Sequence, residues 1–221
     1  MTFHELSDTV FVLDLDDTLY PEIDYQTSGY LEVCRWLEEI SGIGLAQDLL
    51  SLRERNERDV LGALCELAAL PLGIKESLLW IYRLHLPKIS LSVSVTAFLQ
   101  ILRERYRVAI LTDGRSVTQR QKIKALGLTD IPVYISEEYA SEKPEPYRFE
   151  LIMKEMPASR YAYVGDNPKK DFIAPNTLGW LTFCLRDKGK NVHSQETEGM
   201  DAKQMPNFWI DSLDETLGLV C

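Results

Sequence analysis

The sequence shows no disulfide-type cysteine spacing, no long apolar run and no signal-peptide pattern. Its four cysteines, Cys34, Cys65, Cys184 and Cys221, are far apart and show no CxxC or cysteine–histidine spacing, which indicates reduced thiols rather than a disulfide framework. No apolar stretch approaches the roughly 20 residues that span a bilayer, and residues 1–10 have neither a basic nor an apolar signal segment. We therefore expect a cytoplasmic protein outside the membrane.

Basic residues are also in deficit. The chain has 24 lysines and arginines against 34 aspartates and glutamates, for a net charge of −10. A surface of this sign disfavours nucleic-acid backbones and anionic membranes as partners, although it does not exclude a local basic cleft. The 221 residues, 45% of them hydrophobic, allow one large domain or one domain with an insert, as a monomer or a homodimer.

Short apolar segments recur along the chain and alternate with helical patterns. Many of the segments are apolar on both faces, which is typical of strands in a parallel sheet covered on two sides. The expected strands are residues 10–15, 106–113, 132–136, 161–166, 180–185 and 208–211. The expected helices between them are residues 94–106, 116–127 and 146–156. This alternation predicts an α/β fold, a doubly wound Rossmann-like parallel sheet.

One region interrupts the alternation. From about Asp24 to Pro87 the sequence shows only amphipathic helical patterns, separated by the turn-like segments 41–44 and 70–73. We therefore predict a helical cap inserted at residues 23–87, with residues 1–22 and 88–221 forming the α/β core. The polar segment 187–206 is expected to be a long surface loop.

Acidic and polar residues cluster where the predicted strands end. In open α/β sheets, ligands bind beyond the carboxyl ends of the strands. The residues at these ends are Asp14, Asp16, Asp17, Thr112, Asp113, Gly114, Lys143, Asp166 and Asp171. Like charges about 4 Å apart repel by roughly 1 kcal/mol in water and by roughly 4 kcal/mol at a partly buried site. A divalent cation and a lysine would relieve that repulsion, and Mg²⁺ is the natural candidate because it prefers oxygen ligands and accompanies phosphate.

The same residues carry a resemblance to a known family. The segment "DLDDT" at residues 14–18 resembles the DxDxT motif of the haloacid dehalogenase superfamily of phosphohydrolases. Thr112 in "LT" resembles the second motif, Lys143 the third, and "GDNPKKD" at residues 165–171 the GDxxxxD fourth motif. All four appear in the family's order and together span nearly the whole chain.

The resemblance implies a role for each position. Asp14 would be the nucleophile that forms an aspartyl phosphate, and Asp16 the acid and base for the leaving group and the water. Thr112 and Lys143 would hold phosphoryl oxygens. The expected Mg²⁺ ligands are Asp14, the backbone carbonyl of Asp16, Asp166 and Asp171, the last directly or through water or a lysine.

Four further positions are less determined by the pattern. Asp113 and Gly114 are candidate contacts of the substrate phosphate, although the family often has Asn at position 113. For Asp113, Arg115 and Arg120, a solvated first helical turn explains the residues as well as substrate contact does. Because only Asp14 and Asp16 would share one side of an extended strand, we expect Asp17 to face away, so that Asp17→Asn spares turnover and Asp14→Asn abolishes it.

The position of the insert and the presence of Asp16 narrow the function. An insert between the first and second motifs corresponds to the C1 cap of this superfamily, and stretches of the chain resemble nucleotide 5′-phosphatases and acylneuraminate-9-phosphatases. The dehalogenases lack an acid equivalent to Asp16, which favours a phosphate ester. We predict a Mg²⁺-dependent phosphomonoesterase acting on a nucleotide monophosphate or sugar phosphate. A phosphomutase, a catalytically silent binding or scaffold relative, and a receiver domain are the alternatives.

Overall fold

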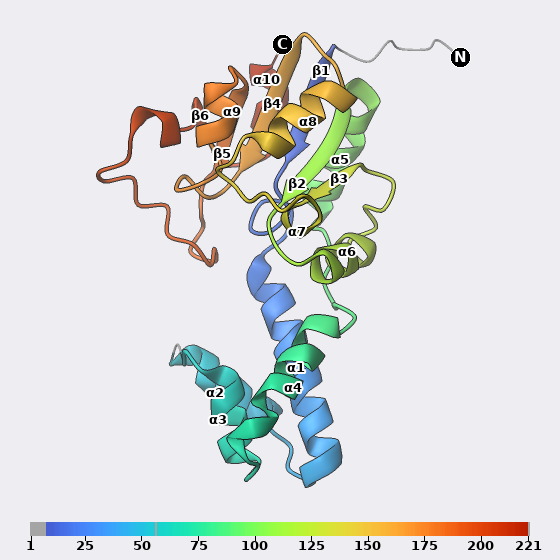
Figure 1. Cartoon of the computed structure of the whole chain (residues 1–221), viewed down its shortest axis with the longest axis vertical. Coiled ribbons are helices and arrows are strands. Elements are labelled where there is room, and N and C mark those ends of the chain that lie inside the picture. The colour runs from blue at the N-terminus through green and yellow to red at the C-terminus, as the bar shows by residue number, and fades with distance from the viewer. Residues whose placement is uncertain (1–7, 56, 221) are drawn as a thin grey trace. The chain divides into compact units, whose positions relative to one another are not determined.

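The computed structural model describes residues 8–55 and 57–220, which divide into two compact units (Figure 1). The first unit contains the described residues up to Ile23 together with those from Ser90 onward. The second unit is Asp24–Ile89. The chain therefore leaves the first unit after its first strand and returns to it before its second.

A six-stranded parallel sheet forms the centre of the first unit. Its order is β3-β2-β1-β4-β5-β6. The strands are β1 (Thr9–Leu13), β2 (Arg107–Thr112), β3 (Val133–Ile135), β4 (Arg160–Gly165), β5 (Leu181–Leu185) and β6 (Phe208–Ile210). The chain proceeds outward from β1 in one direction and from β4 in the other, so the topological switch point lies between these two strands. The predicted α/β Rossmann-like fold is confirmed.

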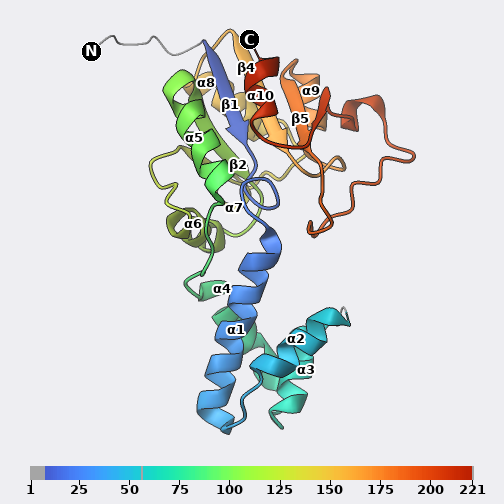
Figure 2. The same cartoon turned by 180° about the vertical axis from the view of Figure 1, so that it is seen from behind.

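Helices cover both faces of this sheet, which explains why its strands are apolar throughout. Figures 1 and 2 show α8 on one face and α5 with α10 on the other. On the α8 side of the sheet, Val12 packs in one cluster with Phe149 and Ile152. On the opposite side, the ring centroid of Phe11 lies 4.8 Å from that of Tyr106, the residue that follows α5. The helices of this unit are α5 (Val93–Arg105), α6 (Ser116–Ala125), α7 (Ser136–Tyr139), α8 (Tyr147–Glu155), α9 (Ile173–Thr177) and α10 (Glu215–Leu219).

The second unit is helical in its described residues, which contain no strand. It comprises most of α1 (Glu22–Ser41), then α2 (Ala46–Glu54), α3 (Val60–Leu67), the 3-10 helix η1 (Leu72–Ile74) and α4 (Lys75–Leu84). Its core gathers apolar residues of these helices around Leu37, Leu49 and Leu64. The helical spacing of apolar residues in segments 30–40 and 60–68 predicts that Ile40 and Leu67 lie on apolar faces, but these side chains are 49% and 43% exposed.

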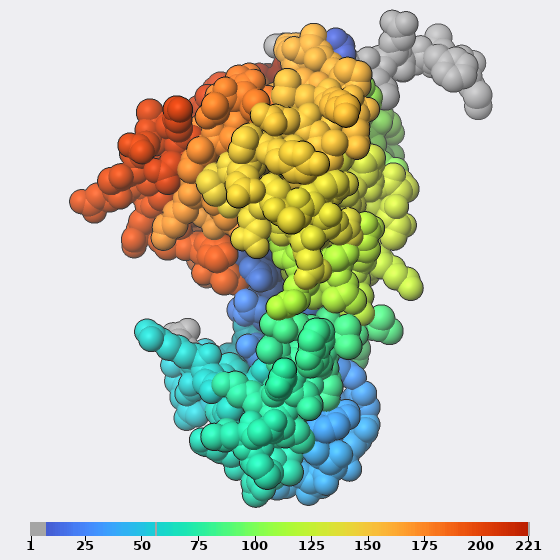
Figure 3. Space-filling model, viewed as in Figure 1, coloured from blue at the N-terminus to red at the C-terminus, as the bar shows by residue number. Residues whose placement is uncertain are grey.

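The long segment between β5 and β6 bears on the site. The segment after β5 has one regular element before β6, the 3-10 helix η2 (Ala202–Gln204). Figure 3 shows this part of the chain, in orange to red, along one side of the first unit.

None of the helices in residues 8–55 and 57–220 combines the length and apolar character needed to cross a bilayer.

Candidate active site

The carboxyl ends of the central strands bring three predicted residues together. Asp14 follows β1 directly, and its N–H donates to the carbonyl of Val164 in β4 at 2.8 Å. Thr112 is the last residue of β2, and Asp166 follows β4 directly. The strands are parallel and adjacent, so their ends meet at one edge of the sheet.

Lys143 lies between two of the predicted carboxylates. Its Nζ is 3.0 Å from Asp14 Oδ1 and 2.8 Å from Asp171 Oδ1, and it donates to the hydroxyl of Tyr163 at 3.1 Å. Burial alone would lower the pKa of Lys143, but Asp14 and Asp171 raise it well above its usual value. The ammonium therefore keeps its charge although the side chain is only 1% exposed.

Gly165 allows Asp171 to reach this position. A Cβ at Gly165 would lie 2.5 Å from Asp171 Oδ2, so a larger residue would displace the carboxylate. The same oxygen accepts the N–H groups of Asp166 at 3.2 Å and Asn167 at 2.8 Å. The glycine and the last aspartate of "GDNPKKD" are thus coupled through direct contact.

Asp16 lies on the other side of the site, among residues of α6. Its Oδ2 accepts from Gln119 Nε2 at 2.9 Å, and its Oδ1 accepts from Lys122 Nζ at 2.8 Å. The Tyr20 hydroxyl also donates to Oδ1. Burial raises the pKa of Asp16, but Lys122 and the hydrogen-bond donors outweigh this effect, and the net pKa lies below its usual value.

The structure corrects the prediction for Asp17. The strand β1 ends at Leu13, not at residue 15, and Asp17 adopts a left-handed backbone with φ of 54°. Its side chain is therefore not on the far side of a strand: it is buried and lines the same cavity as Asp14. Its two oxygens accept the N–H groups of Glu22 at 2.8 Å and Val192 at 2.7 Å.

Asp113 is held by cations and by the backbone. Its carboxylate pairs with Arg148, whose side chain is fully buried, and with Lys170 at 3.2 Å. It also accepts the N–H of Lys143 at 3.2 Å. Burial raises the pKa of Asp113, but Lys143, Lys170 and Arg148 together hold it below its usual value. These contacts place the segment that carries Lys143 next to the end of β2.

The remaining candidate positions, Gly114, Arg115 and Arg120, bind residues outside the acidic cluster. Gly114, with φ of 138°, donates its N–H to Ser136 Oγ at 2.9 Å, and a Cβ there would lie 3.2 Å from Gln119 Cδ. Arg115 and Arg120 form ion pairs with glutamates of α7 at 3.7 and 2.7 Å. Neither arginine lines the cavity, which agrees with a solvated helix start.

A small cavity with a volume of about 120 Å³ lies in the first unit at the carboxyl ends of β1, β2 and β4. It is lined by Asp14, Asp16, Asp17, Glu22, Thr112, Asp113, Lys143, Asp166, Asn167, Lys170 and His193. Typical ligand pockets measure roughly 300–1,000 Å³, so this space can hold a small group or an ion but not a whole metabolite. Carboxylates outnumber lysines in the lining of this cavity. Burial and the negative charge of Asp16 therefore raise the pKa of Glu22 to about 7.

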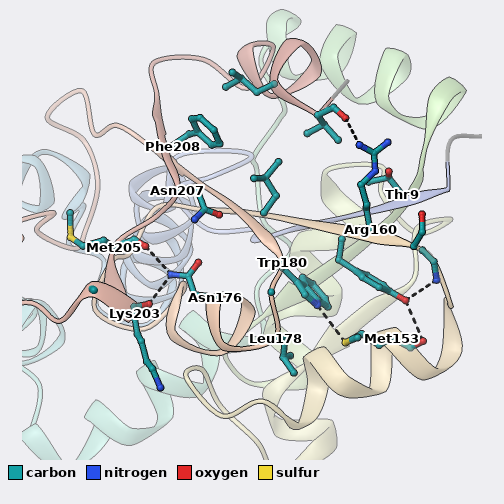
Figure 4. A pocket seen from close by; sticks show the side chains of 18 residues that line it. Thr9, Met153, Arg160, Asn176, Leu178, Trp180, Lys203, Met205, Asn207 and Phe208 are labelled. Atoms are coloured by element: carbon teal, nitrogen blue, oxygen red, sulfur yellow. Dashed lines mark hydrogen bonds between the residues drawn. The ribbon is translucent and has the colours of Figure 1, made fainter.

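A second cavity, of about 1010 Å³, lies at the opposite end of the strands (Figure 4). Thr9, Arg160 and Leu181, which begin β1, β4 and β5, all line it. Two of its labelled polar side chains bind backbone carbonyls: Asn176 donates to those of Lys203 and Met205 at 2.8 Å, and Arg160 donates to that of Val220 at 3.3 Å. The cluster of buried carboxylates around Lys143 is at the other edge, where ligands of open α/β sheets bind.

A profile of haloacid dehalogenase-like hydrolases matches residues 9–179, which include every residue of the predicted site. The chain belongs to this hydrolase family. Pyrimidine 5′-nucleotidase YjjG from Escherichia coli (strain K12) is 27% identical over 130 residues, which cover 57% of this chain and 54% of that protein. The match thus spans only about half the length of this curated relative.

Solved structures of the family share the fold. YfnB from Bacillus subtilis, described as a HAD-hydrolase bound to magnesium, superposes with a TM-score of 0.64 at 16% identity and covers 98% of this chain and 99% of its own. A HAD phosphatase from Thermococcus onnurineus gives a TM-score of 0.60 at 22% identity, with 96% and 97% covered. At such identities the likeness establishes the architecture alone.

The acidic cluster of this HAD-like hydrolase fits a small divalent cation. Asp14, Asp166 and Asp171 are buried and can each present an oxygen within 4.8 Å of the others. Burial, with the charges of Asp171 and Asp14, raises the pKa of Asp166 to about 9. Among the described residues no donor is aligned for a hydrogen bond to Asp171 Oδ1, although Lys143 Nζ is 2.8 Å away. Hard oxygen ligands with excess negative charge are what Mg²⁺ selects.

Sequence reasoning missed the part of the site that the β5–β6 loop supplies. Asn191 donates to Asp166 Oδ2 at 2.9 Å, and Gln195 donates to the backbone carbonyl of Asp166 at 2.7 Å. The N–H of Val192 binds Asp17, and His193 lines the cavity. The polar composition of segment 187–206 predicts a surface loop, and nothing in its spacing indicates that amides within it reach a strand end.

Proposed function

We propose that this HAD-like hydrolase is a Mg²⁺-dependent phosphomonoesterase that transfers the phosphoryl group of a small metabolite to Asp14 and then to water. The observation that carries the proposal is the position of Asp14, a buried carboxylate with Lys143 at 3.0 Å and two further carboxylates within reach of a shared cation. A second acid, Asp16, is held separately at the same cavity. Two carboxylates in different environments are what a nucleophile and an acid–base residue require.

In the first step, a carboxylate oxygen of Asp14 attacks phosphorus while the phosphorus–oxygen ester bond breaks. Asp16, protonated at this stage, gives its proton to the leaving oxygen, and the product is an alcohol. Burial and the charge of a bound phosphate would favour this protonated form against the lowering of the Asp16 pKa by Lys122. In the second step, Asp16 takes a proton from water, whose oxygen attacks phosphorus and releases inorganic phosphate with Asp14 regenerated. Thr112 and Lys143 would hold the phosphoryl oxygens, and Asp113 would border the phosphate. Gly114 does not line the cavity, and its N–H is bound to Ser136 Oγ.

The proposed metal ligands are Asp14, the carbonyl of Asp16 and Asp166. Asp171 would complete the site, while its Oδ2 stays bound to the amides of Asp166 and Asn167. When bound, Mg²⁺ would screen the charge of the nucleophile from that of the phosphate and stabilise the charge of the transition state. Without a cation, the carboxylates lining the cavity would repel a phosphate dianion.

The helical second unit, Asp24–Ile89, is proposed to be a C1-type cap that contributes substrate selectivity and excludes water during the reaction. The cavity of about 120 Å³ in the first unit is large enough for the phosphoryl group only. Selectivity for the rest of the substrate must therefore come from residues outside that cavity. Similarity to the pyrimidine 5′-nucleotidase places nucleoside monophosphates first among the substrates to test, ahead of sugar phosphates.

The test is phosphate release from a panel of nucleoside monophosphates, sugar phosphates, polyol phosphates and 4-nitrophenyl phosphate, with Mg²⁺ and with excess EDTA. We expect wild type to release phosphate only with Mg²⁺, and Asp14→Asn to be inactive at unchanged unfolding temperature. Equal inactivity of wild type and Asp14→Asn across the whole panel would refute the proposal. Activity that EDTA leaves unchanged would refute its metal dependence.

A further inference from the structure

Two side chains of α6 are buried at the active site although they are polar. Gln119 is 1% exposed and Lys122 is 4% exposed, and their spacing of three residues places them on one face of the helix. Lys124, two residues further on, is exposed. A buried ammonium group and a buried amide are costly unless they are paired, so their partners indicate what they do.

Their partners are two of the proposed functional residues. Lys122 Nζ donates to Asp16 Oδ1 at 2.8 Å. Gln119 Nε2 donates both to Asp16 Oδ2 at 2.9 Å and to Thr112 Oγ1 at 2.6 Å. Both oxygens of Asp16 are thereby held from one helix face, and a single amide nitrogen joins this carboxylate to the hydroxyl at the end of β2.

The backbone next to α6 leaves space for this arrangement. Gly114 adopts φ of 138°, and a Cβ at this position would approach Gln119 Cδ to 3.2 Å. The side chain of Gln119 therefore lies directly against a glycine that a larger residue could not replace without a shift. This packing limits the rotamers of Gln119 and keeps its amide directed at Asp16 and Thr112.

We propose that Gln119 and Lys122 are positioning residues that hold Asp16 for proton transfer at a fixed distance from the phosphate-binding hydroxyl of Thr112. This inference rests on the proposed phosphatase function and adds to it two residues outside the four motifs. Neither side chain lines the cavity, so both act through Asp16 and Thr112 rather than on the substrate.

The proposal predicts a dependence on the leaving group. An alkyl phosphate loses a strongly basic alkoxide and needs the proton of Asp16, whereas 4-nitrophenyl phosphate loses a stable phenolate and needs it much less. Loss of Lys122 or Gln119 should therefore slow alkyl ester hydrolysis far more than aryl ester hydrolysis. A purely structural role would reduce both rates in proportion to the folded fraction.

The experiment compares kcat/KM for glycerol 2-phosphate and 4-nitrophenyl phosphate in wild type, Lys122→Met and Gln119→Asn. The control is Lys124→Met, which removes the same charge from the exposed face of the same helix. We expect both test variants to lose about tenfold or more on the alkyl ester and less than about threefold on the aryl ester, within the range of general acid catalysis. Lys124→Met should match wild type, and Lys122→Arg should restore part of the alkyl activity.

A second comparison uses the Asp16→Asn background. If Lys122 acts through Asp16, adding Lys122→Met to Asp16→Asn should change the alkyl-to-aryl ratio by less than about twofold. Equal losses on both esters, or a full Lys122→Met effect without Asp16, would overturn the inference. Should Lys122→Met fail to fold, Gln119→Asn alone carries the same expectation.

The outcomes also separate this inference from the proposed function. If wild type hydrolyses both esters and Asp14→Asn does not, the function stands, and an unchanged ratio in the α6 variants refutes only the positioning role. If wild type hydrolyses neither these esters nor the wider panel, both proposals fail together.

Discussion

Replacing Asp17 with asparagine tests whether this residue is a bystander or a structural link between two parts of the site. Asparagine has nearly the same shape and tolerates the left-handed backbone that Asp17 adopts at φ of 54°. The substitution therefore leaves the turn intact and changes only the hydrogen bonding. Both carboxylate oxygens accept backbone N–H groups, from Glu22 at 2.8 Å and Val192 at 2.7 Å, and asparagine can accept only one of them with its carbonyl oxygen.

The expected cost is about 2 kcal/mol of unfolding free energy. A buried N–H left without an acceptor costs about 1–3 kcal/mol, and here it would face the new amide group. Burial raises the pKa of Asp17 above its usual value despite the two N–H donors, so losing the charge relieves part of its desolvation. The expected loss of unfolding free energy therefore lies in the middle of that range.

The substitution should also reduce activity. Val192 follows Asn191, which donates to Asp166 Oδ2 at 2.9 Å. Releasing Val192 from Asp17 would loosen the loop that holds this proposed metal ligand. We expect a fall in kcat of about tenfold, in contrast to the expectation from sequence that Asp17→Asn spares turnover.

Urea-induced unfolding at pH 7 measures the stability term, and phosphate release on the best substrate measures the activity. The matched control is Asp214→Asn, because Asp214 is exposed and its side chain makes no cap hydrogen bond; it should lie within about 0.5 kcal/mol of wild type. If Asp17→Asn is as mild as this control in both assays, the reasoning from its two hydrogen bonds is wrong.

Two further predictions concern other contacts of the site. Gly165→Ala should lower kcat by about 100-fold while circular dichroism still shows a folded chain, because its Cβ would lie 2.5 Å from Asp171 Oδ2; activity within threefold of wild type would contradict this contact. Asp113→Asn should cost about 3 kcal/mol in urea unfolding at pH 7, since it leaves the fully buried Arg148 without its carboxylate. Burial raises the pKa of Asp113, but the neighbouring cations lower it overall, so this difference should be complete above about pH 4 and fade as the pH falls through the lower folded-state pKa. Asp130→Asn, which breaks a half-exposed ion pair, is the control and should cost under about 0.5 kcal/mol; a difference for Asp113→Asn that does not depend on pH would contradict the assignment.

The central part of the site could be predicted because it follows from strand order. In a parallel sheet, residues directly after adjacent strands meet at one edge whatever the details of packing. Asp14, Thr112 and Asp166 therefore come together once β1, β2 and β4 are identified. Lys143 lies in the segment that follows β3 and α7. Its ammonium is placed between Asp14 and Asp171.

The direction of Asp17 could not be predicted from the alternation of a strand. The strand β1 stops at Leu13, and one residue with positive φ then turns the side chain of Asp17 into the cavity. Periodicity describes regular backbone only, so a single left-handed residue lies outside what it can predict.

By itself the sequence determined the α/β class, the helical block and the residues at the ends of the central strands, because apolar periodicity and strand order set these features. Tertiary structure alone decided how those residues are supported. Gln119 and Lys122 hold Asp16 from more than 100 positions away, and the loop carrying Asn191 reaches Asp166. Such contacts depend on where folded segments meet, and no local pattern of polar residues specifies which distant carboxylate each will bind.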